Sequence, residues 1–330
     1  MGVLKVRGTI PIAQFWPDGT ADADTTKIQV SVRHDSFSFS EDGRNFRVTH
    51  VFDDARVVGK SRGPVIRNDH ITVRLQGVDA PELHYRAAAL PRSDEISEQV
   101  RRRFNDLNKE RRQHWAESAT LALRRKLANF GRDRIECEVV SLVDHPHELV
   151  DTYGRVVANI RVGSNFDADI NLWLAEEAWV VPTFYTSMTR EEIDALLEAM
   201  RKGQRKGRVG GAVTGDTTKF DKNLLYRPHG EPQGDNGPLL MPKLFRRQVA
   251  YQMQRQAGVV RGPFKSFLAR SPDPCFELEH FVDMTLHSAP EKKLDQFVQG
   301  TRFTRAPHEL VFKEKFSSVV DPQGRRLERF

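Results

Sequence analysis

Residues 72–82 combine an arginine with two carboxylates at the end of a predicted strand. The residues before the corner alternate between apolar and polar types, which is typical of a half-buried strand. Pro81 has no backbone N–H to donate to a sheet, so the strand must end before it. Arg74, Asp79 and Glu82 are therefore held at one strand end. These residue types suit the binding of a metal ion and a phosphate group.

Two further segments could complete such a site. Asp151-Thr152-Tyr153-Gly154-Arg155 supplies a second arginine on a tight glycine turn, and Asp22-Ala23-Asp24 precedes another predicted strand. Taken alone, each segment is an ordinary turn whose charged side chains need only be solvated. The three segments agree in order, in spacing and in the type of element that carries them. Together they predict a phosphodiesterase site.

Composition excludes several other classes of protein. The chain has 330 residues, of which 38% are hydrophobic, enough for a substantial core and for two domains. Two cysteines are too few for a disulfide scaffold or a thiolate zinc site. No apolar stretch approaches the roughly 20 residues that span a bilayer. The sequence contains no Walker loop, no HExxH and no nucleophilic Ser or Cys motif.

The positive charge is concentrated in the carboxyl-terminal third. Residues 216–330 hold 19 Lys and Arg against 14 Asp and Glu, which is most of the chain's net charge of +6. Such an excess fits a polyanionic partner, and solubility alone explains it equally well. The segments 101–103 and 109–112, also basic, are either solvated faces or contacts to a nucleic acid backbone. The loop 144–148, Asp-His-Pro-His-Glu, is interpreted as a connection rather than a metal site.

Periodicity and turn residues outline the elements that must position these groups. A hairpin is expected from 5–16 and 26–32, and further strands at 72–77, 134–143 and 155–162. Helices are expected at 93–107, 109–129, 170–178 and 189–205. Beyond a linker, the pattern predicts a helix at 242–256 and strands at 276–281 and 310–316. Five strands interrupted by helix, with a long connection, are typical of an OB-type barrel.

The motif Arg74-x4-Asp79-x-Pro81-Glu82, followed by Asp151-x-Tyr153-Gly154-Arg155, closely resembles the staphylococcal nuclease (thermonuclease) family. The strand opening Asp22-Ala23-Asp24-Thr25 and the element Ile170-Asn171-Leu172 resemble further parts of that family. The resemblance covers about residues 5–210. It implies a β-rich α+β fold, a five-stranded OB-fold barrel with helices, to which a small carboxyl-terminal α+β domain is added.

The resemblance implies a role for each residue of the motifs. Asp24, Asp79 and the carbonyl of Ala80 would hold Ca²⁺, and Glu82 would contact the attacking water as general base or positioning group. Arg74 and Arg155 would clamp the scissile phosphate. The implied reaction is hydrolysis at the 5′ P–O bond, which leaves 3′-phosphate ends.

The substrate pocket departs from the family pattern. Thr152 replaces the family's lysine, whereas Tyr153 is kept. Two tyrosines that bind the terminal nucleotide become Phe184 and either Tyr185 or Thr186. We expect Tyr153, Phe184 and Tyr185 to contact substrate, because stacking on a base needs only an aromatic face. An exonuclease preference is not implied.

We therefore expect a Ca²⁺-dependent hydrolase, an endonuclease acting on single-stranded or locally opened DNA and possibly RNA, with no membrane partner. The alternative is a non-catalytic OB-fold module that binds nucleic acid or protein. The expected domains are a nuclease domain at 1–210 with insertions at 33–70 and 83–108, a linker at 211–237, and a basic domain of unknown role at 238–330. Without a recognisable signal peptide, a cytoplasmic location is expected, with secretion lacking a cleaved signal as the alternative.

Overall fold

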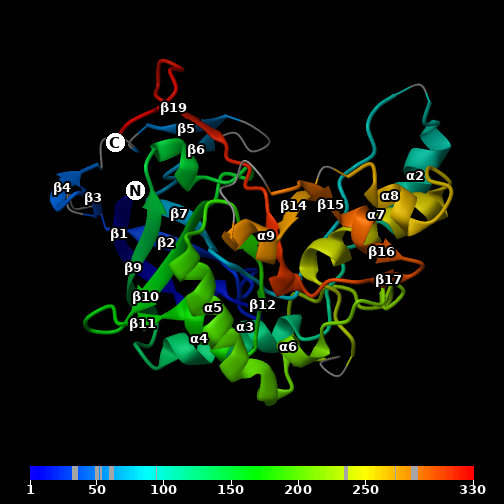
Figure 1. The fold of residues 1–330 in the computed structure, drawn as a ribbon, viewed down its shortest axis with the longest axis horizontal. Coiled ribbons are helices and arrows are strands. Elements are labelled where there is room, and N and C mark those ends of the chain that lie inside the picture. Colours follow the sequence, from blue (N-terminus) through cyan, green and yellow to red (C-terminus); the bar gives the residue numbers. More distant parts are fainter. Residues whose placement is uncertain are drawn as a thin grey trace. The chain divides into compact units, whose positions relative to one another are not determined.

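A computed structural model describes residues 1–31, 36–48, 52, 54–58, 63–93, 95–233, 237–271, 273–283 and 289–330. The chain forms two compact units, each made of segments that are distant in sequence (Figure 1). The first unit comprises Met1–Val78, Thr120–Glu176 and Glu314–Phe330. The second comprises Asp79–Ala119 and Glu177–Lys313. One boundary lies inside the short strand β8, Val78–Asp79.

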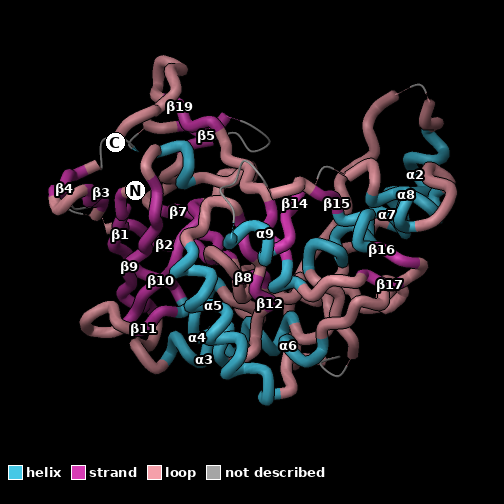
Figure 2. The backbone as a smooth tube through the Cα atoms, in the orientation of Figure 1, coloured by secondary structure: helices cyan, strands magenta, loops and turns pink. Residues whose placement is uncertain are grey.

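A closed five-stranded barrel forms the centre of the first unit (Figure 2). Its strands are β1 (Gly2–Pro11), β2 (Thr25–Val30), β7 (His70–Leu75), β9 (Arg134–Val143) and β10 (Val156–Val162). β1 pairs with β2 and β9, β2 with β7, β7 with β10, and β10 with β9. Only the β7–β10 pair is parallel among these five pairings. This closed order confirms the predicted OB-fold barrel.

The alternating sequence explains why the strands close into a barrel. In β7, Ile71 and Val73 are fully buried, and in β9 Ile135, Cys137 and Val139 are each 1% exposed. These side chains lie two residues apart, so each strand directs one row of them into the barrel interior. Because the sheet is closed, each of the five strands pairs with a neighbour on both sides. No barrel strand is therefore an open edge strand.

Shorter elements complete the first unit. Strands β3 (Phe37–Glu41) and β4 (Arg44–Arg47) extend the sheet beside β1, and β11 (Ala168–Asp169) pairs with β10. Helix α4 (Ile170–Glu176) packs beside β10. A separate sheet joins β5 (Arg56–Val58), β6 (Gly63–Pro64) and β19 (Ser318–Val320). The end of the chain therefore belongs to the unit that contains the barrel. The remaining elements are η1 (Ile12–Gln14), η2 (Pro146–Leu149) and most of α3 (Ala116–Ala128).

The second unit contains an α+β core. Strands β13 (Phe184–Tyr185), β18 (Leu310–Phe312), β14 (Pro274–Glu277) and β15 (Lys292–Lys293) form a four-stranded sheet. Helix α2 (Glu98–Leu107) packs against α7 (Pro242–Ala257), as Figure 1 shows. The other elements are α5 (Arg190–Gly203), α6 (Val209–Ala212), α8 (Phe264–Leu268), α9 (Leu278–Asp283), β12 (Val181–Pro182), β16 (Val298–Gln299), β17 (Arg302–Phe303), η3 (Gln204–Lys206), η4 (Leu294–Phe297) and η5 (Pro307–Glu309). No helix of the described residues has both the length and the apolar character required to traverse a bilayer.

Several predicted elements differ in extent from those observed. The helix expected at 93–107 begins at Glu98, and the strands expected at 5–16 and 310–316 end at Pro11 and Phe312. The helix expected at 109–129 begins only at Ala116, because the backbone before it pairs with other segments, as between Arg111 and Tyr85. The strand expected at 276–281 ends at Glu277, where α9 begins. Val32, the expected end of a strand, lies outside the described residues. The expected division into domains at 1–210 and 238–330 stays a prediction, because it concerns which parts of the chain fold independently.

Candidate active site

Strands β2 and β7 bring Asp24 and Arg74 to one end of the barrel. Thr25, the first residue of β2, pairs with Arg74, and the Leu75 N–H donates to the Asp24 carbonyl at 2.8 Å. The Thr25 hydroxyl donates to Asp24 Oδ1 at 3.0 Å, and the Thr25 N–H donates to Asp22 Oδ1 at 3.0 Å. Arg74 itself is only 7% exposed. Short local hydrogen bonds thus fix the loop that carries Asp24 beside the Arg74 strand.

Arg155 is positioned by a tight turn that Asp151 organises. Asp151 Oδ1 accepts the backbone N–H groups of Tyr153 at 2.9 Å and Arg155 at 3.0 Å. Its Oδ2 accepts the Arg155 Nε at 2.9 Å and lies 2.8 Å from Nη2. Gly154 has φ +81°, a left-handed conformation that glycine adopts without steric cost. Asp151 and Gly154 therefore both help to position Arg155.

Arg74 lies on one barrel strand, and Arg155 lies just before the strand that pairs with it. β7 and β10 are parallel, Arg74 pairs with Val157, and Arg155 immediately precedes β10. The Arg155 Nη1 also donates to the Thr25 hydroxyl at 3.2 Å, the same hydroxyl that contacts Asp24. The first unit thus places the residues Arg74, Arg155 and Asp24 at one end of a closed sheet, with Arg155 and Asp24 joined through Thr25. That combination can bind a phosphate and a cation.

The predicted carboxylates that follow β7 belong to the second unit. Asp79 and Ala80 are 1% and 3% exposed, and the Glu82 side chain is 14% exposed. Arg246 of α7 contacts both acids: its Nη1 donates to Glu82 Oε1 at 2.6 Å, and its Nη2 lies 3.9 Å from Asp79 Oδ2. The structure therefore brings Asp79 and Glu82 to one guanidinium group. Their buried charges require such a cationic partner.

Gln113 fixes the backbone at Glu82. The Glu82 N–H donates to Gln113 Oε1 at 3.0 Å, and the Gln113 N–H donates to the Glu82 carbonyl at 2.8 Å. Gln113 Nε2 donates in turn to the Leu240 carbonyl at 2.8 Å, just before α7 begins. Gln113 is only 4% exposed, so these hydrogen bonds are shielded from water. This side chain links the loop of Glu82 to the helix that carries Arg246.

The aromatic residues predicted to contact substrate differ in exposure. Tyr153 is 60% exposed, and the Arg155 guanidinium lies 5.5 Å from its ring centre. Phe184 is fully buried in β13, and Tyr185 is 7% exposed. The Tyr185 ring packs near Phe312, 6.1 Å between centres. Tyr153 thus has an accessible face for a base, while the substrate contacts of Phe184 and Tyr185 stay predictions.

The predicted basic segments divide into exposed and buried groups. On α2, the side chain of Arg102 is 77% exposed and Arg101 donates to the Ser93 carbonyl. Arg112, by contrast, is 3% exposed and lies 3.3 Å from the fully buried Glu117. Arg227 also donates to both Glu117 carboxylate oxygens, at 3.0 and 2.9 Å. Arg111 and Arg112 are therefore part of the interior of the second unit, whereas Lys109 is exposed.

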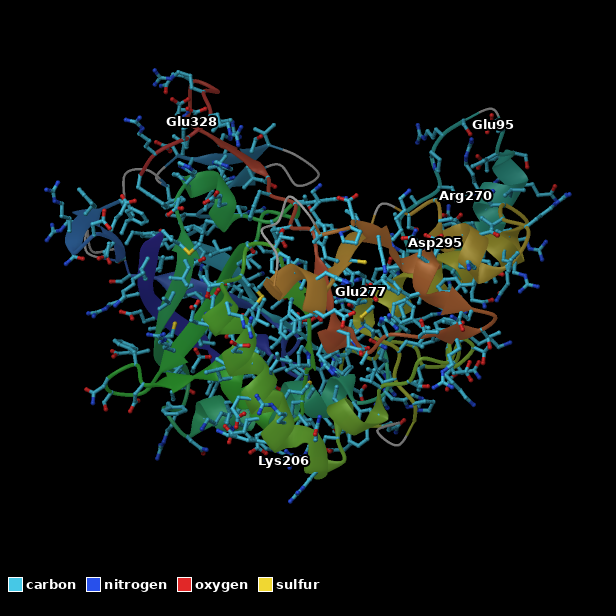
Figure 3. All side chains as sticks on the ribbon, in the orientation of Figure 1. Glu95, Lys206, Arg270, Glu277, Asp295 and Glu328 are labelled. Carbon is cyan, nitrogen blue, oxygen red and sulfur yellow. The ribbon has the colours of Figure 1, made fainter. Side chains whose placement is uncertain are left out.

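One acidic group outside the predicted site has ligand-like geometry. Glu277, Glu279 and His280 place one ligand atom each within 4.8 Å of one another, within the part of the chain that the structure describes. Glu277, labelled in Figure 3, accepts hydrogen bonds from Lys292 and Arg305, which lower the pKa of its carboxyl group despite its burial. The same cations neutralise the cluster, so its charge does not require a metal ion.

Sequence reasoning missed Arg246 and Gln113. The sequence predicted a helix at 242–256, but its pairing with Glu82 joins residues 164 positions apart, and no local pattern carries that information. Gln113 lies inside a segment that was predicted as helix. A polar residue on a helix is common, so its type gave no reason to single it out. The only signal in the sequence was the adjacent pair Arg246-Arg247 on a predicted helix.

Comparison with known proteins supports the same interpretation of the barrel. None of the curated proteins with which the chain was compared matches it. The family model described as "Staphylococcal nuclease homologue" matches residues 72–210, from β7 to α6. The barrel strands β1 and β2 precede the matched segment and complete the same closed sheet. Residues 72–210 thus form the matched part of a staphylococcal-nuclease-like domain with an OB-fold barrel.

Proposed function

We propose that this protein is a Ca²⁺-dependent nuclease that hydrolyses phosphodiester bonds of DNA, and of RNA, with little sequence preference. The domain family indicates a function related to nucleic acid. The observation that carries the proposal is the position of Arg74 on β7 and of Arg155 just before the parallel strand β10, with Thr25 linking Arg155 to Asp24. A protein that only binds nucleic acid does not need two anchored arginines beside a carboxylate.

The residues proposed to hold Ca²⁺ have suitable chemistry. Asp24 and Asp79 offer carboxylate oxygens, and Ala80 offers a carbonyl oxygen, which are the donors that this hard cation prefers. Asp79 is only 1% exposed, and its Oδ2 lies 3.9 Å from the Arg246 guanidinium. When bound, Ca²⁺ would polarise the phosphate and orient the attacking water.

The chain's own residues have separate tasks in the proposed reaction. Arg74 and Arg155 bind the nonbridging phosphoryl oxygens and stabilise the charge that develops on them. Glu82 holds the water and accepts its proton as the water oxygen bonds to phosphorus. The bond from phosphorus to the 5′ oxygen breaks, and the leaving oxygen takes up a proton from solvent, so the products are a 3′-phosphate and a 5′-hydroxyl. Tyr153, the exposed aromatic residue, is proposed to stack on a neighbouring base.

Cleavage of a labelled single-stranded DNA tests the proposal. Wild-type protein is incubated with Ca²⁺ or with EDTA, beside Arg74→Ala and Glu82→Gln. Arg190→Ala and Glu198→Gln are matched controls, because both residues form exposed pairs on α5. We expect Ca²⁺-dependent cleavage that both site variants lower by at least about 100-fold, as for removal of one group that stabilises the transition state.

Each alternative result has a definite meaning. If wild-type protein binds the DNA without cleaving it under any condition, the protein is a binding module instead of an enzyme. If cleavage survives both site substitutions at the wild-type rate, the assignment of Arg74 and Glu82 is wrong. If EDTA does not change the rate of cleavage, the protein hydrolyses the DNA without a metal ion, and the metal part of the proposal is wrong.

A further inference from the structure

Arg246 contacts the carboxylate of Asp79, which is proposed to hold the metal ion, and that of Glu82, which is proposed to hold the water. It lies on α7 within the second unit, together with Asp79 and Glu82. Its guanidinium is 2.6 Å from Glu82 Oε1 and 3.9 Å from Asp79 Oδ2. The exposed fractions of these side chains are 33% for Arg246, 14% for Glu82 and 2% for Asp79. The arginine thus reaches from the solvent side toward two largely buried acids.

This contact is built into the fold. Gln113 bonds to both backbone polar groups of Glu82 and, through its side-chain amide, to the Leu240 carbonyl. Pro242, two residues later, begins the helix that carries Arg246. A single buried side chain therefore sets the distance between the Glu82 loop and the start of α7. An arginine on the first turns of that helix is held near the acids by the backbone as well as by charge.

Charge explains what the arginine does there. Two carboxylates that contact one guanidinium repel each other, and their burial removes the water that would screen them. The Arg246 guanidinium offsets that repulsion in the protein without metal. A divalent cation bound to Asp79 would be repelled by the guanidinium, because both are positively charged. The metal ion and Arg246 therefore weaken each other's interaction with the carboxylate.

We propose that Arg246 is an internal counter-ion of Asp79 and Glu82 that competes with divalent cations for Asp79, and so sets the metal affinity of the site. This inference rests on the proposed function, because it takes Asp79 as a Ca²⁺ ligand. Because of this competition, binding of Ca²⁺ requires the Arg246 side chain to release the carboxylate. The affinity for Ca²⁺ is then lower than the carboxylates alone would give.

Calorimetric titration of the full-length protein with Ca²⁺ tests the competition without any measurement of cleavage. The variants are Arg246→Ala and Arg246→Gln, each alone and combined with Asp79→Asn. Arg247→Ala is the matched control, because Arg247 is the next residue of α7 and forms an ion pair with Asp273 at 2.6 Å. Thermal unfolding with and without Ca²⁺ checks that each variant is folded and gives a second measure of binding.

We expect Arg246→Ala and Arg246→Gln to bind Ca²⁺ about tenfold more tightly than wild type, a coupling within the usual range for two ligands of one site. Arg247→Ala keeps the wild-type affinity, and Asp79→Asn removes the gain. Binding that depends on Asp79 but is unchanged or weaker in both Arg246 variants overturns the competition and leaves the metal site intact. If neither wild type nor the Arg246 variants bind Ca²⁺ through Asp79, the metal part of the proposed function fails, and this inference fails with it.

Discussion

Asp151 holds the guanidinium of Arg155 through two contacts of one carboxylate oxygen, 2.9 Å to Nε and 2.8 Å to Nη2. The other oxygen accepts the backbone N–H groups of Tyr153 and Arg155. The acid is 4% exposed, whereas the Arg155 side chain is 25% exposed. Asp151 therefore anchors an arginine whose far end, Nη1, still reaches the Thr25 hydroxyl.

The first prediction concerns this anchor. In Asp151→Asn the side chain keeps its shape but loses its charge, so the Arg155 guanidinium is no longer fixed in direction. A displacement of about 1 Å at a catalytic group lowers the rate by on the order of 100-fold, so we expect kcat to fall by about 10-fold to 100-fold. KM should change little, because Arg155 is proposed to act on charge that develops in the transition state.

Steady-state kinetics on the single-stranded DNA substrate measures both constants. Asp194→Asn, which removes an exposed partner of Arg190 on α5, is the control and should keep the wild-type rate. A folded Asp151→Asn protein with wild-type kcat would show that the orientation of Arg155 is unimportant for the reaction.

A second prediction concerns Asn171, which ties two barrel strands together. Its Nδ2 donates to the Gln76 carbonyl at 2.9 Å, and its Oδ1 accepts the Ile160 N–H at 3.2 Å. Asn171 is 1% exposed, so Asn171→Ala would leave these backbone groups buried without their partner. Each such group costs about 1–3 kcal/mol, and we expect the free energy of unfolding to fall by about 2–3 kcal/mol.

Urea unfolding of the full-length protein measures this loss. Glu198→Ala on the exposed face of α5 is the control, with an expected change within about 0.5 kcal/mol. A loss for Asn171→Ala no larger than that of the control would contradict the structural role of the amide.

The barrel was largely predictable because its signals are local. The alternation in 134–143 predicted β9 with the same bounds, and β10 begins one residue later than expected, at Val156. Asp24, Arg74 and Arg155 could be named from three short motifs, each placed at a strand end by proline or glycine. Period and turn chemistry act over a few residues, so the sequence expresses them directly.

The second unit was less predictable because it depends on contacts between distant segments. Residues 109–113 were predicted as the start of a helix, yet the Gln113 N–H donates to the Glu82 carbonyl and α3 begins at Ala116. Tertiary pairing overrode helical propensity there, and no local pattern records such pairing. The first unit has a comparable case, because β19 pairs with β5 and so joins the end of the chain to an early strand.

The last prediction concerns the pH dependence of stability at Glu277, which is 5% exposed in the second unit. Hydrogen bonds from Lys292, and then from Arg305, hold the pKa of its carboxyl group below the usual 4.5, against the effect of burial. A carboxyl group with a lowered folded-state pKa stabilises the fold above its unfolded-state pKa. That contribution is lost as the pH falls from about 4.5 through the lower folded-state value. Glu277→Gln should therefore lower the free energy of unfolding by about 1–3 kcal/mol at neutral pH, the usual cost of losing charged hydrogen bonds.

Urea unfolding at neutral pH and at several values below 4.5 measures this dependence. The difference between wild type and Glu277→Gln should shrink as the pH falls, because the wild-type carboxyl group becomes protonated and loses its advantage over the neutral amide. Glu279→Gln is the matched control, since Glu279 is the exposed neighbour in the same cluster. A difference that stays constant across this range would mean that Glu277 stabilises the fold by packing, and that its charge contributes nothing.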